Sequence, residues 1–157
     1  MKKTTYFDSD RRDGWPAPDE LRPYFFALPG QQWFDTDGND GASLTAEGVG
    51  GTEHLPPGGG RVDVRLMMYG DPKLGVFLWY SKKGGGHQDV FNSKGDLSRL
   101  GEYTRTLHGD PIPIGLYVPF DRAFAAVKEF IETEGGLPRC IEWIANRDLP
   151  PNTFPPP

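Results

Sequence analysis

The chain has 157 residues, a length typical of one domain, with 17 Lys and Arg against 22 Asp and Glu and a formal net charge of −5. This balance argues against a nucleic-acid binder and against a polybasic membrane-surface protein, because both classes usually present an excess of basic side chains. Aromatic residues make up 13% of the chain, which excludes a disordered protein, while 21 Gly and 16 Pro predict many turns and few long helices.

The N-terminal segment is polar and contains Gly14, Pro16 and Pro18, so we expect residues 1–20 to form a loosely packed arm. No apolar stretch of the signal-peptide type follows Met1. The sequence also lacks a run of about 18 apolar residues that could span a membrane. These observations predict a cytoplasmic protein with no membrane partner.

Cys140 is the single cysteine of the chain, and it therefore cannot form an internal disulfide. It follows Leu137-Pro138-Arg139 and precedes Ile141, in a segment that we interpret as the start of a strand. A free cysteine in such a place usually behaves as a small apolar side chain, so we expect Cys140 to be buried.

The first helix is expected at residues 19–28, because Pro18 suits a first-turn position and Asp19 and Glu20 suit the positive end of the helix dipole. Residues 31–60 are rich in Gly, Asp and Asn and predict turns. Short strands are expected within them at 32–34 and 42–46.

The clearest strand pattern lies in residues 61–69, where apolar and charged residues alternate, and in residues 74–80, which are almost continuously apolar. A third strand is expected at 88–92. Because glycine-containing turns separate these three segments, the sequence predicts an antiparallel meander. Residues 97–108 fit either a short helix or a strand, with apolar spacing slightly in favour of the helix.

The last part of the chain begins with alternating apolar residues over 112–118, where Pro111 and Pro113 predict an edge strand. An amphipathic helix is expected at 119–134, and Gly135-Gly136 would end it. A short strand at 141–144 and an extended Pro-rich tail at 150–157 complete the chain. Together these elements predict an α+β fold in one domain spanning 1–157: an antiparallel sheet of five or six strands with the 119–134 helix packed on one face.

Catalytic and metal-binding patterns were tested against the sequence, and none fits. His54, His87 and His108 lie far apart, and there is no cysteine pair, so a zinc site is not expected. A calcium loop counted from Asp35 has Asp40 and Ala46 where glycine and an acid are needed. Neither glycine run continues into Gly-Lys-Ser/Thr, and no Gly-x-Ser-x-Gly occurs. We therefore expect a protein that is not an enzyme and that has no metal or cofactor.

Aromatic and acidic residues gather near the glycine turns, a combination that suits docking onto a basic partner. The aromatic members are Trp33, Trp79, Tyr80 and Phe91, and the acidic members are Asp35, Asp37, Asp40, Asp89 and Asp96.

Four features of the C-terminal half resemble a known family. They are an apolar-Pro strand end, a helix closing in Glu-Phe, a Gly/Pro turn and a short strand carrying Trp, found here as Val118-Pro119, Glu129-Phe130, Gly136-Leu137-Pro138 and Trp143. In this order they resemble the first-numbered immunity-protein family of bacterial polymorphic toxin systems. Residues 75–80 resemble the central strand of that family, and the resemblance covers roughly residues 60–147.

The resemblance implies a small α+β protein without catalysis, encoded beside a toxin gene, that binds the toxin domain and neutralises it in the producing cell. In this family the toxin is often a nucleic-acid deaminase, whose cleft tends to be basic because it holds a polyanion. We therefore expect a cognate toxin domain as partner, neutralised by occlusion of its active site. The expected toxin-facing residues are His87, Asp89, Phe91, Asp96, Asp35, Asp37 and Asp40.

Two alternatives from other classes remain open on the sequence. A small-ligand-binding or regulatory domain would be favoured by a pocket lined by Trp79, Tyr80 and Trp143. A hydrolase would be favoured by a cleft in which His87 or His108 is hydrogen-bonded to a carboxylate.

Overall fold

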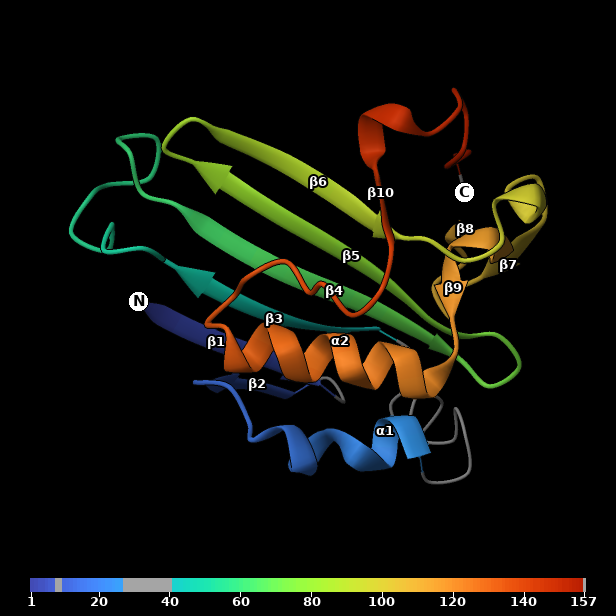
Figure 1. Cartoon of the computed structure of the whole chain (residues 1–157), viewed down its shortest axis with the longest axis horizontal. Helices are drawn as coiled ribbons and strands as arrows, with labels where there is room; N and C mark the ends of the chain where they lie inside the picture. Colours follow the sequence, from blue (N-terminus) through green and yellow to red (C-terminus); the bar gives the residue numbers. More distant parts are fainter. Residues whose placement is uncertain (8–9, 27–40, 157) are drawn as a thin grey trace.

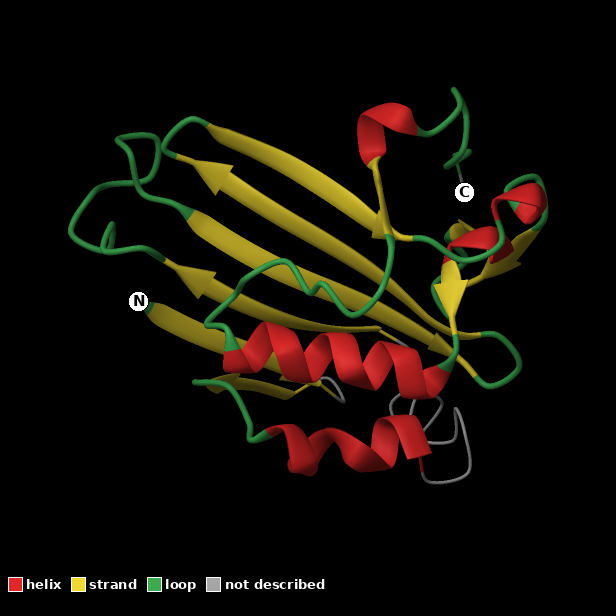
Figure 2. Cartoon of the chain, viewed as in Figure 1, coloured by secondary structure: helices red, strands yellow, loops and turns green. Residues whose placement is uncertain are grey.

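The structure is a computed structural model, and it describes residues 1–7, 10–26 and 41–156. Within these residues the chain forms one large antiparallel sheet with two α-helices side by side on one face (Figures 1 and 2). This arrangement confirms the predicted α+β class. The strand order is β10-β6-β5-β4-β3-β1-β2, with β9 paired to β5. These strands are β1 (Lys2–Phe7), β2 (Asp10–Asp13), β3 (Gly41–Glu47), β4 (Asp63–Asp71), β5 (Gly75–Gly84), β6 (His87–Ser93), β9 (Tyr117–Val118) and β10 (Trp143–Ala145).

The centre of the sheet is the meander β4-β5-β6, which confirms the interpretation of residues 61–92, and the strand expected at 42–46 is β3. The continuous apolar run in β5 follows from burial on both faces. Val76, Leu78 and Tyr80 pack into the main core under the helices, while Phe77 and Trp79 point to the opposite side. The expected strand at 32–34 lies outside the described residues.

The longer helix, α2 (Phe120–Glu132), confirms the helix expected at 119–134. Its buried stripe packs on the sheet and includes Ala123, Val127 and Phe130. The helix ends as predicted, with Gly135 in the left-handed region at φ +97° and its N–H donating to the carbonyl of Phe130 at 2.9 Å.

The shorter helix, α1 (Arg22–Phe26), follows a 3₁₀ turn at Pro18–Leu21. The helix expected at 19–28 is therefore found where the chain is described, and residues 27 and 28 lie outside the described part. Phe25 and Phe124 pack edge to face at 5.6 Å, so α1 lies against α2 as well as over the sheet. In the described part of the chain, neither helix has the length and apolar character needed to cross a membrane.

The expectation of a loosely packed arm over residues 1–20 is wrong. β1 lies between β3 and β2, with Thr4 opposite Thr45 and Thr5 opposite Arg12. Phe7 is buried in the main core. The segment has a polar sequence because every second residue of β1 faces away from the helices, where a polar side chain does not have to be buried.

Residues 97–118 also differ from expectation. In place of one helix or strand, residues 97–108 contain a 3₁₀ turn, η3 (Leu97–Arg99), and β7 (Tyr103–Arg105), because Asp96 caps the turn and Gly101 interrupts the helical path. The strand expected at 112–118 is divided into β8 (Pro111–Pro113), the 3₁₀ turn η4 (Ile114–Leu116) and β9. β8 pairs only with β7 among the described strands, as its prolines predicted.

A second, smaller apolar core lies on the sheet face opposite the helices, at one end. Phe77, Leu116 and Tyr117 form its centre, and Trp79 and Ile144 pack against it. The Pro-rich tail contributes to the same region, since the ring of Phe154 lies 6.2 Å from that of Phe77. Among the residues that the structure describes, the second face of the sheet is therefore covered at this end only.

Candidate functional site

The remainder of the sheet face opposite the helices is covered by no described element, and we call it the open face. Its side chains follow from strand alternation, because the residues between them, such as Leu44, Leu66 and Tyr80, are buried under the helices. The open face consists of Lys2, Thr4, Tyr6, Arg11, Asp13, Ser43, Thr45, Glu47, Asp63, Arg65, Met67, Trp79, Ser81 and Lys83, together with Gln88 and Val90 of β6.

The register of four strands sets these side chains in rows across the sheet. One row runs from Tyr6 through Ser43 and Met67 to Trp79 and contains most of the apolar side chains of this face. In the next row Arg65 lies between Thr45 and Ser81. Side chains from distant parts of the sequence, such as Tyr6 and Trp79, thus lie on one surface.

The open face is hollowed. A depression of about 660 Å³ is lined by side chains from β1 to β5, among them Tyr6, Arg11, Arg65, Trp79 and Lys83. A concave surface that combines aromatic and charged side chains is typical of a binding site.

The side chain of Trp79 is anchored at this surface. This side chain packs against the second core and also lines the depression. The ammonium nitrogen of Lys83 lies 5.9 Å from the centre of the Trp79 ring, within the range of a cation–π contact. An aromatic residue held in place by a core can bind a partner with little loss of side-chain entropy.

Charges on the open face fall into a paired and an unpaired group. Arg61 donates to both carboxylate oxygens of Asp63, at 2.9 and 3.0 Å, and lies 3.6 Å from Glu47. The hydrogen bonds that Arg61 donates to Asp63 raise the pKa of Arg61. Arg11, Arg65 and Lys83 are exposed, and none has a carboxylate partner within the described residues. These last three cations are therefore available to a partner molecule.

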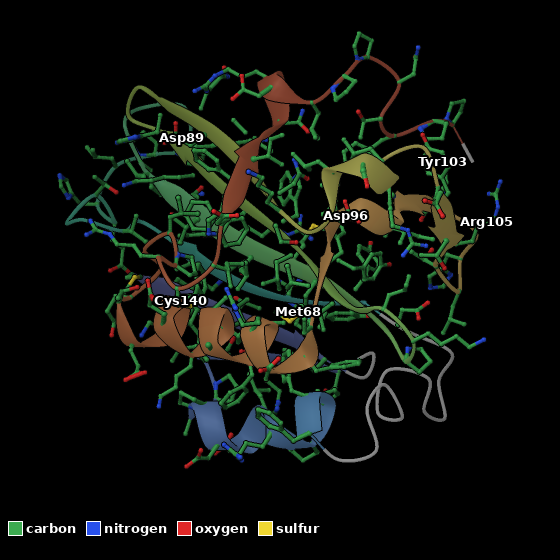
Figure 3. All side chains as sticks on the ribbon, turned by 45° about the vertical axis from the view of Figure 1, so that its right-hand side comes forward. Met68, Asp89, Asp96, Tyr103, Arg105 and Cys140 are labelled. Carbon is green, nitrogen blue, oxygen red and sulfur yellow. The ribbon has the colours of Figure 1, made fainter. Side chains whose placement is uncertain are left out.

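The structure does not gather the residues expected to face a toxin into one site. His87 and Asp89 form an exposed pair on β6, with His87 Nδ1 3.5 Å from Asp89 Oδ2, on the helix side of the sheet. Phe91 lies on the same side and packs on the main core. Asp96 lies beyond the opposite end of β6 (Figure 3). Asp35, Asp37 and Asp40 lie outside the described residues.

Asp96 has a structural role in this fold. Its carboxylate accepts hydrogen bonds from the backbone N–H of Ser98 at 3.0 Å and from the Ser98 hydroxyl at 2.6 Å, which caps η3. The same bonds lower the pKa of Asp96. Asp89 caps no element, so its exposed carboxylate is the better candidate for contact with a partner.

The pocket that would favour a small-ligand-binding domain, lined by Trp79, Tyr80 and Trp143, does not form. Tyr80 and Trp143 lie 6.3 Å apart on the helix side of the sheet, whereas Trp79 points to the open face. The three side chains therefore do not line one cavity, and the feature that would favour a small-ligand site is missing from this part of the fold.

The hydrolase alternative has a histidine beside a carboxylate, but neither Ser81 nor Ser93 is placed to act with that pair. Ser81 lies on the opposite side of the sheet from His87. The Ser93 hydroxyl accepts a bond from the N–H of Leu78 and donates one to the carbonyl of Leu116. In the described part of the chain, no group of three or more His, Cys, Asp and Glu residues could hold a metal ion.

Cys140 is exposed, so the expectation that it is buried is wrong. It lies in the irregular segment between α2 and β10, where the following residue, Ile141, occupies the place in the core (Figure 3). Partial burial and the nearby carboxylate of Glu129 raise the pKa of the Cys140 thiol. A thiol of this kind is a poor nucleophile at neutral pH.

A sheet covered by helices on one face, with a hollowed and charged opposite face, defines a small α+β protein with a surface suited to binding. The family model described as Immunity protein Imm1 matches residues 27–145, and the chain belongs to this family. This confirms the resemblance found in the sequence and assigns the chain to the immunity proteins. No curated protein and no solved structure was found to match the chain.

Sequence reasoning singled out Trp79 but missed Tyr6, Arg11, Arg65 and Lys83. The alternation in residues 61–66 did place Arg65 on the polar side of a strand. That signal became a site only once the pairing of β1 with β3 and the packing of the helices showed which face stays open.

Proposed function

We propose that this immunity protein binds a cognate toxin domain encoded beside it and neutralises that domain by covering its active site. The observation that carries the proposal is the open face of a chain in the Immunity protein Imm1 family. An inhibitor of this kind needs a preformed surface large enough for another protein, with rigid aromatic anchors at its centre. The depression around Trp79 supplies such a surface.

A nucleic-acid deaminase is the toxin class that we propose. Such an enzyme holds its substrate in a basic cleft, because the substrate is a polyanion. The net charge of −5 on this chain would speed the encounter with a basic protein and would repel free nucleic acid. Inhibition then requires only that the bound immunity protein block the path of the polynucleotide to the cleft.

Co-expression tests the binding function. The toxic domain encoded beside this gene is expressed in a bacterial host with and without the full chain. We expect the chain to restore growth and to co-purify with the toxin domain in a stoichiometric complex. Absence of both rescue and complex would overturn the proposal.

Enzyme kinetics test the mode of neutralisation and the toxin class together. The purified toxin domain is assayed for deamination of single-stranded DNA and RNA with increasing amounts of the chain. We expect inhibition that excess polynucleotide relieves, since both compete for the cleft. Inhibition that substrate cannot relieve would argue against occlusion, and a toxin without deaminase activity would remove that assignment while leaving the binding function in place.

A further inference from the structure

The basic character of the open face contrasts with the rest of the chain. Asp63 and Glu47 on this face pair with Arg61, and the remaining charged side chains are four basic and one acidic, namely Lys2, Arg11, Arg65 and Lys83 against Asp13. The whole chain, by comparison, has an excess of acidic residues and a net charge of −5. A local excess of cations on an acidic protein shows which sign of charge this surface can bind.

We propose that the open face receives an acidic segment of the toxin domain. Carboxylates of that segment pair with Arg11, Arg65 and Lys83, and one of its apolar side chains packs on Trp79. The proposal rests on the proposed function and adds to it the contact surface and the chemistry of the partner.

The three cations are distributed along the open face, with Arg11 beside Tyr6 at one end and Lys83 over Trp79 at the other. Arg11 lies opposite Tyr6 in the register of β2 with β1, and Arg65 lies one row from Met67 and Trp79. The Arg guanidinium binds a carboxylate in a two-pronged geometry, and the bond strengthens as the interface excludes water. Aromatic side chains with unpaired cations beside them can bind the apolar and the acidic groups of one partner segment together.

Protein is favoured over nucleic acid as the occupant. Tyr6 and Trp79 could stack with bases, and the three cations could contact phosphates. A polynucleotide, however, would extend beyond the open face and meet the acidic remainder of the chain, whereas a short acidic segment touches the basic patch alone. The occupant is therefore a local group of carboxylates, as a folded toxin domain can offer.

The position of the open face also connects it to the exposed pair on β6. Lys83 is the last but one residue of β5, and its neighbour Lys82 lies opposite Asp89. In the described residues β10 pairs with β6 only from Phe91 to Ser93, so the edge of β6 near Asp89 is uncovered. A toxin domain seated on the open face and reaching past β6 would bring its basic cleft towards Asp89.

A double charge reversal tests the inference, with a matched control on the other side of the molecule. The test variant is Arg11→Glu with Arg65→Glu, and the control is Arg122→Glu with Lys128→Glu on the outer surface of α2. All four side chains are exposed, so neither variant is expected to unfold the chain. Binding of each full-length variant to the catalytically inactivated toxin domain is measured at two salt concentrations.

We expect the test variant to bind about tenfold or more weakly and the control to stay within about threefold of the wild type. Reversal of one acidic residue of the toxin to Lys should then restore binding of the test variant. Equal binding by the test variant and the wild type would overturn the assignment of the open face while leaving the proposed function intact. Failure of the wild type itself to bind would instead overturn the proposed function, and this inference with it.

A separate arm distinguishes nucleic acid. A fluorescent single-stranded RNA of about 20 nucleotides is titrated with the wild type and the test variant. We expect no binding by either. Binding by the wild type that the double reversal abolishes would assign the open face to nucleic acid and overturn the acidic protein segment.

Discussion

The phenol of Tyr80 donates a hydrogen bond to the backbone carbonyl of Gly135, with 2.9 Å between the two oxygens. Tyr80 lies on β5 and is 3% exposed, and Gly135 is the left-handed residue just beyond α2. The bond therefore fixes the end of the main helix to the centre of the sheet. The Phe130 ring packs edge to face on the Tyr80 ring at 6.1 Å and completes this contact.

Replacement of Tyr80 by Phe should destabilise the chain by about 1–3 kcal/mol, because the Gly135 carbonyl would lose its buried partner. Urea unfolding followed by tryptophan fluorescence measures the change. Tyr103→Phe is the control, since Tyr103 is 40% exposed and its hydroxyl can bond to water. Equal stability of the two variants would show that the Tyr80 bond contributes nothing.

Stability should also fall at high pH through the same residue. Burial, aided by the carboxylate of Asp89, raises the pKa of Tyr80 to about 12 from the ordinary value of 10. Between these two values the unfolded chain releases the phenolic proton and the folded chain retains it, so the contribution is complete below pH 10 and is lost as the pH rises towards 12. The loss amounts to about 2–3 kcal/mol.

The measurement compares the wild type with Tyr80→Phe in urea at several pH values between 9 and 12, so that the other tyrosines and lysines titrate in both. The stability difference between them should shrink as the pH rises. A difference that stays constant across this range would contradict the linkage.

Local patterns predicted the central part of this fold. Local spacing of apolar residues indicated the correct structure for the alternation in residues 61–69, the apolar run at 74–80 and the stripe at 119–134. This works because the period of the pattern and the side of the element that is buried can be seen within a few residues. β1 was missed because Thr4, Thr5 and Tyr6 carry little apolar signal. Its strand conformation depends on pairing with β3, which lies about 40 residues later.

The candidate site was harder to predict than the fold. Arg11 and Arg65 come to lie on one face only through the order β2-β1-β3-β4, and that order is a property of the whole sheet. The expected residues on β6 were chosen from glycine-turn composition, which does not show that Asp89 and Asp96 lie at opposite ends of the strand. Composition showed that charged and aromatic residues are frequent near the turns. Only the topology of the sheet determines which of these side chains lie on the same face.

Gly75 should tolerate no side chain. It begins β5 at φ +106°, and a Cβ there would lie 2.1 Å from the carbonyl oxygen of Val118, which belongs to β9. Gly75→Ala should therefore destabilise the chain by about 3 kcal/mol or more, since backbone strain and a backbone clash add together.

Gly86→Ala is the matched control, because Gly86 also has a positive φ of +88° but a Cβ there would have no atom within 4 Å. It should cost only about 1–2 kcal/mol. The two variants are compared by urea unfolding. Equal losses would show that β9 can move away from β5 without cost.

Asp89 and Asp96 are expected to differ in what they do. Asp96→Ala should lower the unfolding midpoint because η3 loses its cap, while the folded variant still binds the toxin domain. Asp89→Lys should leave the midpoint almost unchanged, since the Asp89 side chain is 42% exposed and its contact with His87 is 3.5 Å long.

The same Asp89→Lys variant should weaken binding of the toxin domain about tenfold if the uncovered edge of β6 meets a basic cleft. Thermal unfolding and titration calorimetry of both variants separate the two roles, with Asp89→Asn as the variant that removes charge without reversing it. The neutral variant should bind with intermediate affinity, because the attraction is lost but no repulsion is added. Wild-type affinity in Asp89→Lys would remove Asp89 from the toxin contact and leave the open face alone as the binding surface.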